Sequence, residues 1–270
     1  MSHITIHFYS FTLITFQYCS ILLEDSNSKP EIHAIACSKH GIHLSSANKS
    51  LLFTLPVRSS TVQTQSSRSQ ISTIGTSGTL KITNLLFLDS EDLLIFSADE
   101  RLYLYQIQRD QQPELLACAT KHTLPLKFLK ATGTGEFIYT ASNDGFVCVY
   151  SLFELIEQGD LTSPLLKIKV SNCDISGVDV LQTSPSWIKL FVTSSDHFLR
   201  IWDLDLSIER WKDNSENGKE HLLANENDRY DFQHGVTCSV IDPTGLHLYL
   251  VLDSDKFQLL KYNGNIYKKI

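Results

Sequence analysis

The sequence predicts an all-β fold of the β-propeller type, in which small antiparallel sheets repeat along the chain. Two observations carry this prediction. In three segments, a tight turn with an acidic residue is followed by a strand of alternating pattern that ends on an aromatic residue. The aromatic residue lies six positions after the acidic residue each time. The pairs are Asp99 with Tyr105, Asp144 with Tyr150, and Asp196 with Trp202. In addition, turn residues such as Asp242-Pro243-Thr244-Gly245 separate short runs of period-two alternation.

Alignment on the acidic turns divides the chain into five repeat units. They cover residues 32–55, 82–108, 126–152, 176–206 and 236–262, and the last unit turns at Asp253 or Asp255. A unit of this size cannot cover both of its own faces, so radial stacking of the units is needed to bury them. We therefore expect five blades plus N-terminal strands from residues 1–31, forming an incomplete or a reduced ring.

Length and composition favour a single folded domain over residues 1–270. A hydrophobic content of 42% and a charged content of 20% are ordinary for a folded protein. The net charge of −7 argues against a broadly basic surface for nucleic acid. Residues 4–23 are apolar, but polar residues interrupt the run and no basic segment precedes it, which favours two short strands over a membrane or secretory segment.

Three segments lie outside the repeats. Residues 59–79 are rich in Ser, Thr and Gln and are expected to form a long loop. Residues 152–158 place Leu152, Leu155 and Ile156 at helical spacing, which predicts a short helix between blades. Residues 212–231 are polar and mostly acidic, so we expect a solvated insertion there.

No motif in the sequence points to catalysis or to a cofactor. There is no G-x-S-x-G elbow, no Walker loop, no G-x-G-x-x-G and no H-E-x-x-H motif. The six cysteines lack metal-binding spacing, which suggests a reducing compartment, and Cys148 is expected to be a small buried apolar residue. We therefore predict no catalytic residue, no metal and no cofactor, and we interpret Asp99, Asp144 and Asp196 as residues that cap the blade turns.

Candidate binding residues are fewer. Trp187 and Trp211 lie beside predicted loops and are candidate partner-binding residues, because exposed tryptophan often anchors protein interfaces. Two modest groups of lysines are expected to be solvated, although an indirect RNA contact stays open. They are Lys121, Lys127 and Lys130, and Lys261, Lys268 and Lys269.

The repeats resemble WD repeats, and in particular those of the propeller subunit of the rixosome. The resemblance rests on residues 94–105, 137–152, 175–179, 191–204 and 236–251, and on the helix-like insert at 153–158. In many WD repeats the turn aspartate meets a histidine from an earlier loop, and His122 and His234 precede the third and fifth units at suitable places. Members of that family are longer and carry additional blades.

This resemblance implies a non-catalytic scaffold in the nucleus, in the nucleolus or nucleoplasm, that serves large ribosomal subunit biogenesis and pre-rRNA processing. Its implied partners are a helical-repeat scaffold and the pre-60S ribosomal particle, with no membrane and no small-molecule substrate. An alternative is a WD-repeat adaptor of a ubiquitin ligase, a trafficking coat or a tRNA-modification complex, in the cytoplasm. A propeller hydrolase would need several ionisable residues converging on the central channel, and the sequence shows no such set.

Overall fold

The computed structural model describes residues 2–8, 17–23, 32–38, 41–46, 49–55, 82–88, 92–107, 113–159, 162–206, 224–232, 234–242, 244–253, 256–262 and 267–269. Side chains are described from residue 82 onward, except those of residues 224–229, 267 and 269. These residues form antiparallel sheets whose strands follow one another in chain order.

Two sheets precede residue 56. One pairs β1 (Ser2–Phe8) with β2 (Gln17–Leu23), as expected for the apolar N-terminal segment. The other contains β3 (Ile32–Ser38), β4 (Gly41–Ser46) and β5 (Lys49–Leu55), and we call it the first blade. It coincides with the first predicted repeat unit. No helix among the described residues is long and apolar enough to cross a membrane.

Four sheets of four strands follow. The second blade contains β6 (Ile82–Leu88), β7 (Leu93–Ala98), β8 (Arg101–Gln106) and β9 (Glu114–Thr120). The third contains β10 (Leu126–Ala131), β11 (Phe137–Ser142), β12 (Phe146–Ser151) and β13 (Leu166–Lys169). The fourth contains β14 (Ile175–Gln182), β15 (Trp187–Ser194), β16 (Phe198–Asp205) and β17 (Ala224–Asp231). The fifth contains β18 (Val236–Ile241), β19 (His247–Leu252), β20 (Phe257–Tyr262) and β21 (Tyr267–Lys269).

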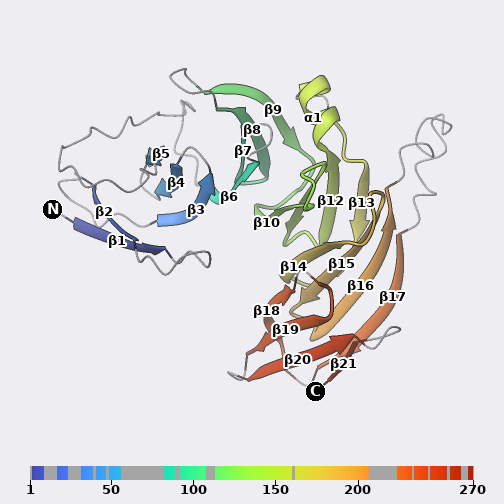
Figure 1. The fold of residues 1–270 in the computed structure, drawn as a ribbon. Coiled ribbons are helices and arrows are strands. Elements are labelled where there is room, and N and C mark those ends of the chain that lie inside the picture. The colour runs from blue at the N-terminus through green and yellow to red at the C-terminus, as the bar shows by residue number, and fades with distance from the viewer. Residues whose placement is uncertain are drawn as a thin grey trace.

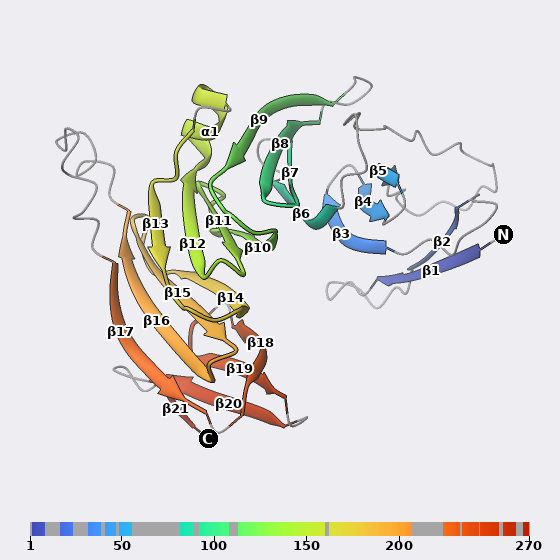
Figure 2. The ribbon, with the colours of Figure 1, turned by 180° about the vertical axis from the view of Figure 1, so that it is seen from behind.

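Consecutive blades meet through their first strands. β3 contacts β6, β6 contacts β10, β10 contacts β14, and β14 contacts β18. Figure 1 and the reverse view in Figure 2 show the blades following one another along an open arc, with β1 and β2 at one end and the fifth blade at the other. The prediction of an all-β propeller is therefore confirmed for the described residues, whose blades follow an open arc.

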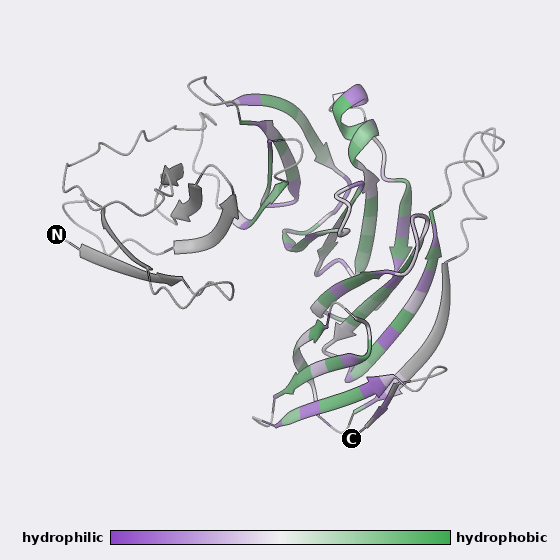
Figure 3. Ribbon diagram, viewed as in Figure 1, coloured by the Kyte–Doolittle hydropathy of each residue, from purple (hydrophilic) through white to green (hydrophobic). Residues whose placement is uncertain are grey.

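Alternation along the strands buries both faces of an inner blade. On β11, Ile138 packs in a cluster with the second blade, whereas Phe137 and Tyr139 pack in a cluster with the fourth. Figure 3 shows the same alternation of hydrophobic and hydrophilic residues along β16. Each interface thus buries the apolar residues of two sheets, which provides the main hydrophobic stabilisation of the arc.

The predicted helix is confirmed as α1 (Leu152–Gln158), in the connection between β12 and β13. Ser151 is the N-cap and accepts the N–H of Glu154, while Gly159 ends the helix with a φ of 56°. Leu152 and Leu155 are the buried residues of this helix. Because the helix has only two turns, this packing rather than its own hydrogen bonds stabilises it.

One expected insertion is shorter than predicted. The sequence predicts a solvated insertion over residues 212–231, but the last eight of these residues form β17, which pairs along β16 as the outer strand of the fourth blade. An outer strand meets solvent and needs little apolar alternation, so its sequence is indistinguishable from a polar loop. Residues 212–223 and the predicted loop 59–79 lie outside the described residues.

Candidate functional site at the two ends of the blades

Each acidic turn connects the second and third strands of a blade, but the three turns are not equivalent. Asp144 and Asp196 lie within three-residue turns, whereas β7 and β8 are joined by only two residues, Asp99 and Glu100. Asp99 itself adopts a left-handed backbone with φ of 51°, which aspartate tolerates better than most residues. Its side chain is exposed, and its carbonyl accepts the N–H of Leu126 at 2.6 Å.

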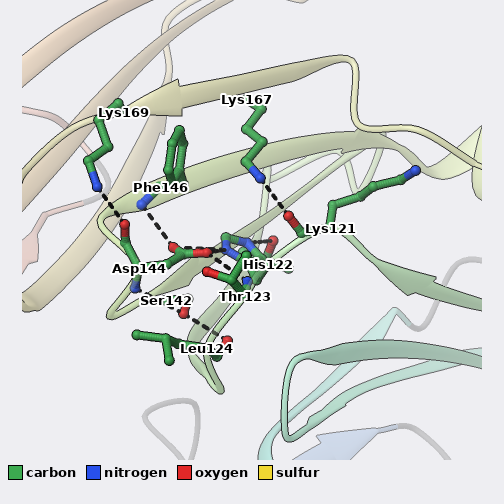
Figure 4. A network of polar contacts seen from close by, with 10 residues as sticks. Lys121, His122, Thr123, Leu124, Ser142, Asp144, Phe146, Lys167 and Lys169 are labelled. Carbon is green, nitrogen blue, oxygen red and sulfur yellow. Dashed lines mark hydrogen bonds and ion pairs between the residues drawn. The ribbon is translucent and has the colours of Figure 1, made fainter.

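In the third blade, a buried histidine and aspartate fix the turn (Figure 4). His122 Nδ1 lies 3.0 Å from Asp144 Oδ2, and His122 Nε2 lies 3.0 Å from Thr140 Oγ1. The Asp144 carboxylate also accepts the backbone N–H groups of Thr123 and Phe146, each at 3.0 Å. The position anticipated for His122 from WD repeats is therefore the one it occupies, while Thr140 was not anticipated.

The pKa values of His122 and Asp144 are both shifted by their surroundings. Burial is the main cause of the lowered pKa of His122, and it outweighs the opposing effect of Asp144. Burial also opposes ionisation of Asp144, but the N–H groups of Phe146 and Thr123 and the nearby His122 outweigh it, so its pKa is lowered. The two side chains are only 1% and 4% exposed, and both ring nitrogens of His122 are occupied. The pair is therefore arranged to hold a turn rather than to transfer protons to a substrate.

The fourth blade uses an arginine instead. Arg200, a buried residue of β16, places Nη2 2.6 Å from Asp196 Oδ2 and donates from Nη1 to Ser194 Oγ at 2.8 Å. Burial of Asp196 opposes its ionisation, but the hydrogen bonds from Arg200 and Ser194 prevail and lower its pKa to about 2. Sequence reasoning missed Arg200, although a charged residue at an inward position of an alternating strand is a usable signal.

In the fifth blade the equivalent pair is looser. His234 Nδ1 lies 3.8 Å from Asp253 Oδ1, with both side chains partly exposed. The N–H of Gly235 donates to Asp253 Oδ2 at 3.1 Å. The chain thus holds its blade turns by a buried histidine, a buried arginine and an exposed histidine in the third, fourth and fifth blades. Asp255 lies outside the described residues.

At the opposite end of the blades, apolar side chains are exposed. The turns between first and second strands lie here, as does α1, because the Leu152 N–H bonds to the carbonyl of Glu136 in the β10–β11 turn. Phe153 on α1 is 71% exposed and Trp187, at the start of β15, is 42% exposed. Ile156 and Leu246 are exposed as well. We call Phe153, Ile156, Trp187 and Leu246 the α1-end surface. Trp211 lies outside the described residues.

The face of the fifth blade that points away from the fourth is also apolar. Val240, Tyr249, Val251 and Phe257 are all exposed on it, and the rings of Tyr249 and Phe257 lie 5.9 Å apart. The register places Tyr249 opposite Val240 and Val251 opposite Phe257, which groups the four side chains on one sheet face. A sheet face of this composition is normally covered by another layer.

The predicted lysines separate into different roles. Lys127 Nζ donates to the carbonyl of Ile175 at 2.8 Å, and Lys130 Nζ lies 3.7 Å from Asp179 Oδ1, so both join the third blade to the fourth. Lys121 is exposed beside the network of Figure 4, and Lys261 and Lys268 are exposed on the fifth blade. Lys269 ends β21, and its side chain is outside the described residues.

Cys148 is buried, as expected, and burial is the main cause of its raised pKa of about 12. A thiol with such a pKa is protonated at neutral pH and therefore unreactive. Among the residues with described side chains, no cluster of His, Cys, Asp and Glu is suited to a metal ion.

Comparison with known proteins identifies the fold. No protein-family model matches the chain, and no curated protein matches it. A chain in the crystal structure of a mitotic checkpoint complex is similar at a TM-score of 0.67 and 10% identity, over 94% of this chain and 70% of that one. Because 1262 chains of solved structures match, the fold is too common to narrow the function. None of these comparisons supports the rixosome resemblance in particular. What they do establish is that this chain has the fold of a WD-repeat β-propeller.

Proposed function

We propose that the chain is a non-catalytic scaffold whose α1-end surface binds a protein partner. The observation that carries this proposal is the exposure of Phe153 and Trp187, two aromatic side chains from neighbouring blades at the same end of the blades. Aromatic residues dominate the binding energy of protein interfaces, and a partner that covers them removes their apolar area from water. A protein–protein scaffold is also the function that agrees with the propeller fold.

The more specific proposal is a subunit of a rixosome-type complex in large ribosomal subunit biogenesis and pre-rRNA processing, located in the nucleus. The helix after the third blade supports it, because a helix-like insert at this place is the more specific trait of the sequence resemblance. On this proposal, α1 and Trp187 face a helical-repeat scaffold, and contact with the pre-60S particle and its RNA is indirect.

Affinity purification of the tagged endogenous protein, followed by mass spectrometry, tests both levels. We expect a rixosome scaffold and pre-60S proteins in the eluate. Recovery of a ubiquitin ligase, a trafficking coat or a tRNA-modification complex, with the protein absent from the nucleolus, would replace the ribosomal role by the adaptor role. An eluate without any stable partner would contradict the scaffold proposal itself.

Two surface variants locate the interface. Phe153→Glu and Trp187→Glu place a charge on the α1-end surface, and each is expected to lower partner recovery by about tenfold or more. Leu124→Glu is the matched control, because Leu124 is a similarly exposed apolar residue in the β9–β10 connection at the other end of the blades. Equal loss in all three variants would show that the α1-end surface is not the interface.

A further inference from the structure

Two lysines and one phenylalanine form a compact cluster at the acidic-turn end of the third blade, next to the backbone of a third lysine, Lys121. The Nζ atoms of Lys167 and Lys169 lie 4.6 Å and 4.7 Å from the centroid of the Phe146 ring. In Figure 4 the ring lies between these two side chains, and the carbonyl group of Lys121 lies beside Lys167, while the Lys121 side chain extends away from both. We call Lys121, Lys167, Lys169 and Phe146 the lysine–phenylalanine patch. All three lysines are exposed to solvent.

The two strand lysines are held in place by the backbone. Lys167 Nζ donates to the carbonyl of Lys121, and Lys169 Nζ donates to the carbonyl of Asp144, each at 2.6 Å. An ammonium group carries three N–H donors, and each of these bonds uses one of them. Together with the cation–π contacts, the bonds reduce the rotamer freedom that a ligand would otherwise have to remove. The charges are therefore positioned before any ligand arrives.

The positive charge of the patch is not neutralised by the described carboxylates. Among residues with described side chains, no Asp or Glu forms an ion pair with Lys121, Lys167 or Lys169. The carboxylate of Asp144, whose carbonyl group binds Lys169, is engaged by His122 and by two backbone N–H groups. This local excess of positive charge occurs in a chain whose net charge is −7, so it marks one place on an otherwise acidic protein.

Strand geometry specifies the shape of a ligand. β13 is the outer strand of the third blade, paired on one side with β12 and unpaired within its sheet on the other. An extended peptide can add to such an edge through backbone hydrogen bonds. Lys167 and Lys169 are two residues apart and lie on the same face, so the residues opposite them on an added strand are also two apart.

We propose that the lysine–phenylalanine patch binds an extended acidic segment of a partner protein, which pairs with the edge of β13 and places two carboxylates, from residues two apart in its sequence, against Lys167 and Lys169. The inference rests on the proposed scaffold function and gives one partner segment a chemistry. A peptide fits better than a nucleic acid, because it supplies the backbone groups for strand pairing and because the acidic remainder of the chain repels a long polyphosphate.

Two synthetic peptides of identical composition test the spacing. One alternates Glu with Thr and Val, and the other places the same Glu residues consecutively. Fluorescence polarisation with the full chain is expected to show binding of the alternating peptide that is about fivefold tighter, because each cross-strand ion pair adds a small increment. Binding is expected to weaken as salt is raised. Equal affinities for the two peptides, or binding of neither, would overturn the proposal.

Variants assign the binding to the patch. Lys167→Glu with Lys169→Glu is expected to weaken binding of the alternating peptide by about tenfold or more. The matched control, Lys256→Glu with Lys261→Glu, makes the same charge change at exposed lysines of the fifth blade and is expected to bind nearly as the wild type. The double variant Lys167→Gln with Lys169→Gln removes both charges and is also expected to weaken binding. An unchanged circular dichroism melt would show that this weakening does not come from a folding defect. Equal weakening by both Glu pairs would indicate bulk charge only and overturn the proposal.

Two further comparisons separate this inference from its alternatives. Tighter binding of a single-stranded RNA oligonucleotide than of the alternating peptide, lost in the Lys167/Lys169 variant, would replace the peptide by RNA. In affinity purification, partners that are retained by the Lys167/Lys169 variant but lost by Phe153→Glu would uphold the scaffold and reject the patch. If the chain binds the alternating peptide specifically but recovers no partner in affinity purification, the patch is upheld and the scaffold proposal is rejected.

Discussion

The carboxylate of Asp179 on β14 accepts the backbone N–H of Ile241 on β18, with 2.8 Å between Oδ2 and N. Its other oxygen, Oδ1, accepts the N–H of Val180 at 3.0 Å and lies 3.7 Å from Lys130 Nζ of the third blade. One buried side chain therefore contacts three consecutive blades near their first strands. Hydrophobic clusters fill the interfaces between blades, but this carboxylate fixes the register of one blade on the next.

Replacement of Asp179 by Ala is expected to lower the free energy of unfolding by about 1–3 kcal/mol, because the buried Ile241 N–H loses its acceptor. Asp179→Asn keeps an acceptor oxygen, so it is expected to lower the free energy of unfolding by less than Asp179→Ala does. Urea unfolding followed by circular dichroism measures both values. Identical losses for Ala and Asn would mean that the Ile241 hydrogen bond is not the stabilising contact.

The buried His122 predicts an acid-sensitive third blade. Burial lowers its pKa below the ordinary 6.5, so below about pH 6.5 the unfolded chain binds more protons than the native one. The free energy of unfolding is therefore expected to fall between pH 7 and pH 5, and His122→Gln is expected to flatten this dependence. Chemical unfolding at several pH values gives the slopes. A slope unchanged in the variant would contradict the prediction.

The Arg200–Asp196 pair predicts a different response. The Asp196 pKa of about 2 lies below its ordinary 3.8, so the contribution of the pair is complete above about pH 3.8 and is lost as the pH falls through about 2. Arg200→Met removes the guanidinium that donates to Asp196 and Ser194, while Ser171, Ser194 and the Phe198 N–H still donate to Asp196, and it is expected to destabilise the chain by about 1–3 kcal/mol. Arg200→Lys is expected to keep only part of the stability that Arg200→Met loses, because a lysine cannot donate to both Asp196 and Ser194 in the geometry of the arginine. Full recovery by Lys in thermal melts would count against this geometry.

Gly145 is expected to tolerate no side chain. Its φ is +77°, and a Cβ added there would lie 2.1 Å from the backbone carbonyl oxygen of Ser171. Gly145→Ala is expected to destabilise the chain by more than about 1 kcal/mol, through backbone strain and this clash. Gly133→Ala is the matched control, since nothing lies within 4 Å of its added Cβ. Differential scanning calorimetry that gave equal melting temperatures for the two variants would refute the prediction.

The inner three strands of each blade could be predicted from sequence, because their hydrophobic alternation lies between recognisable turn residues. The five predicted units match β3–β5, β6–β8, β10–β12, β14–β16 and β18–β20 to within about two residues at each end. The outer strands β9, β13, β17 and β21 were not anticipated. They pair along one edge and meet solvent on the other side, so strand pairing fixes them and their own pattern does not.

The site was predictable only where one residue type recurs with a familiar partner. The approach of His122 to Asp144 follows from the position of WD-repeat histidines, but the replacement of that histidine by Arg200 in the next blade does not. Nothing in the sequence indicated that Asp99 directly follows its strand, β7, whereas one residue separates Asp144 and Asp196 from the strands before them. The distance from the aspartate to the aromatic residue is six positions in all three copies, although the turn before β8 is one residue shorter. Lys167 and Lys169 were missed because β13 was missed.

Each four-stranded sheet takes all of its strands from one continuous stretch of chain, in order. During translation, a blade can therefore be completed as soon as its outer strand leaves the ribosome, before the next blade exists. Until the next blade forms, the newest one presents an uncovered apolar face such as that of Tyr249 and Phe257. In a nascent chain the exposed apolar sheet face therefore moves along the chain by one blade at a time.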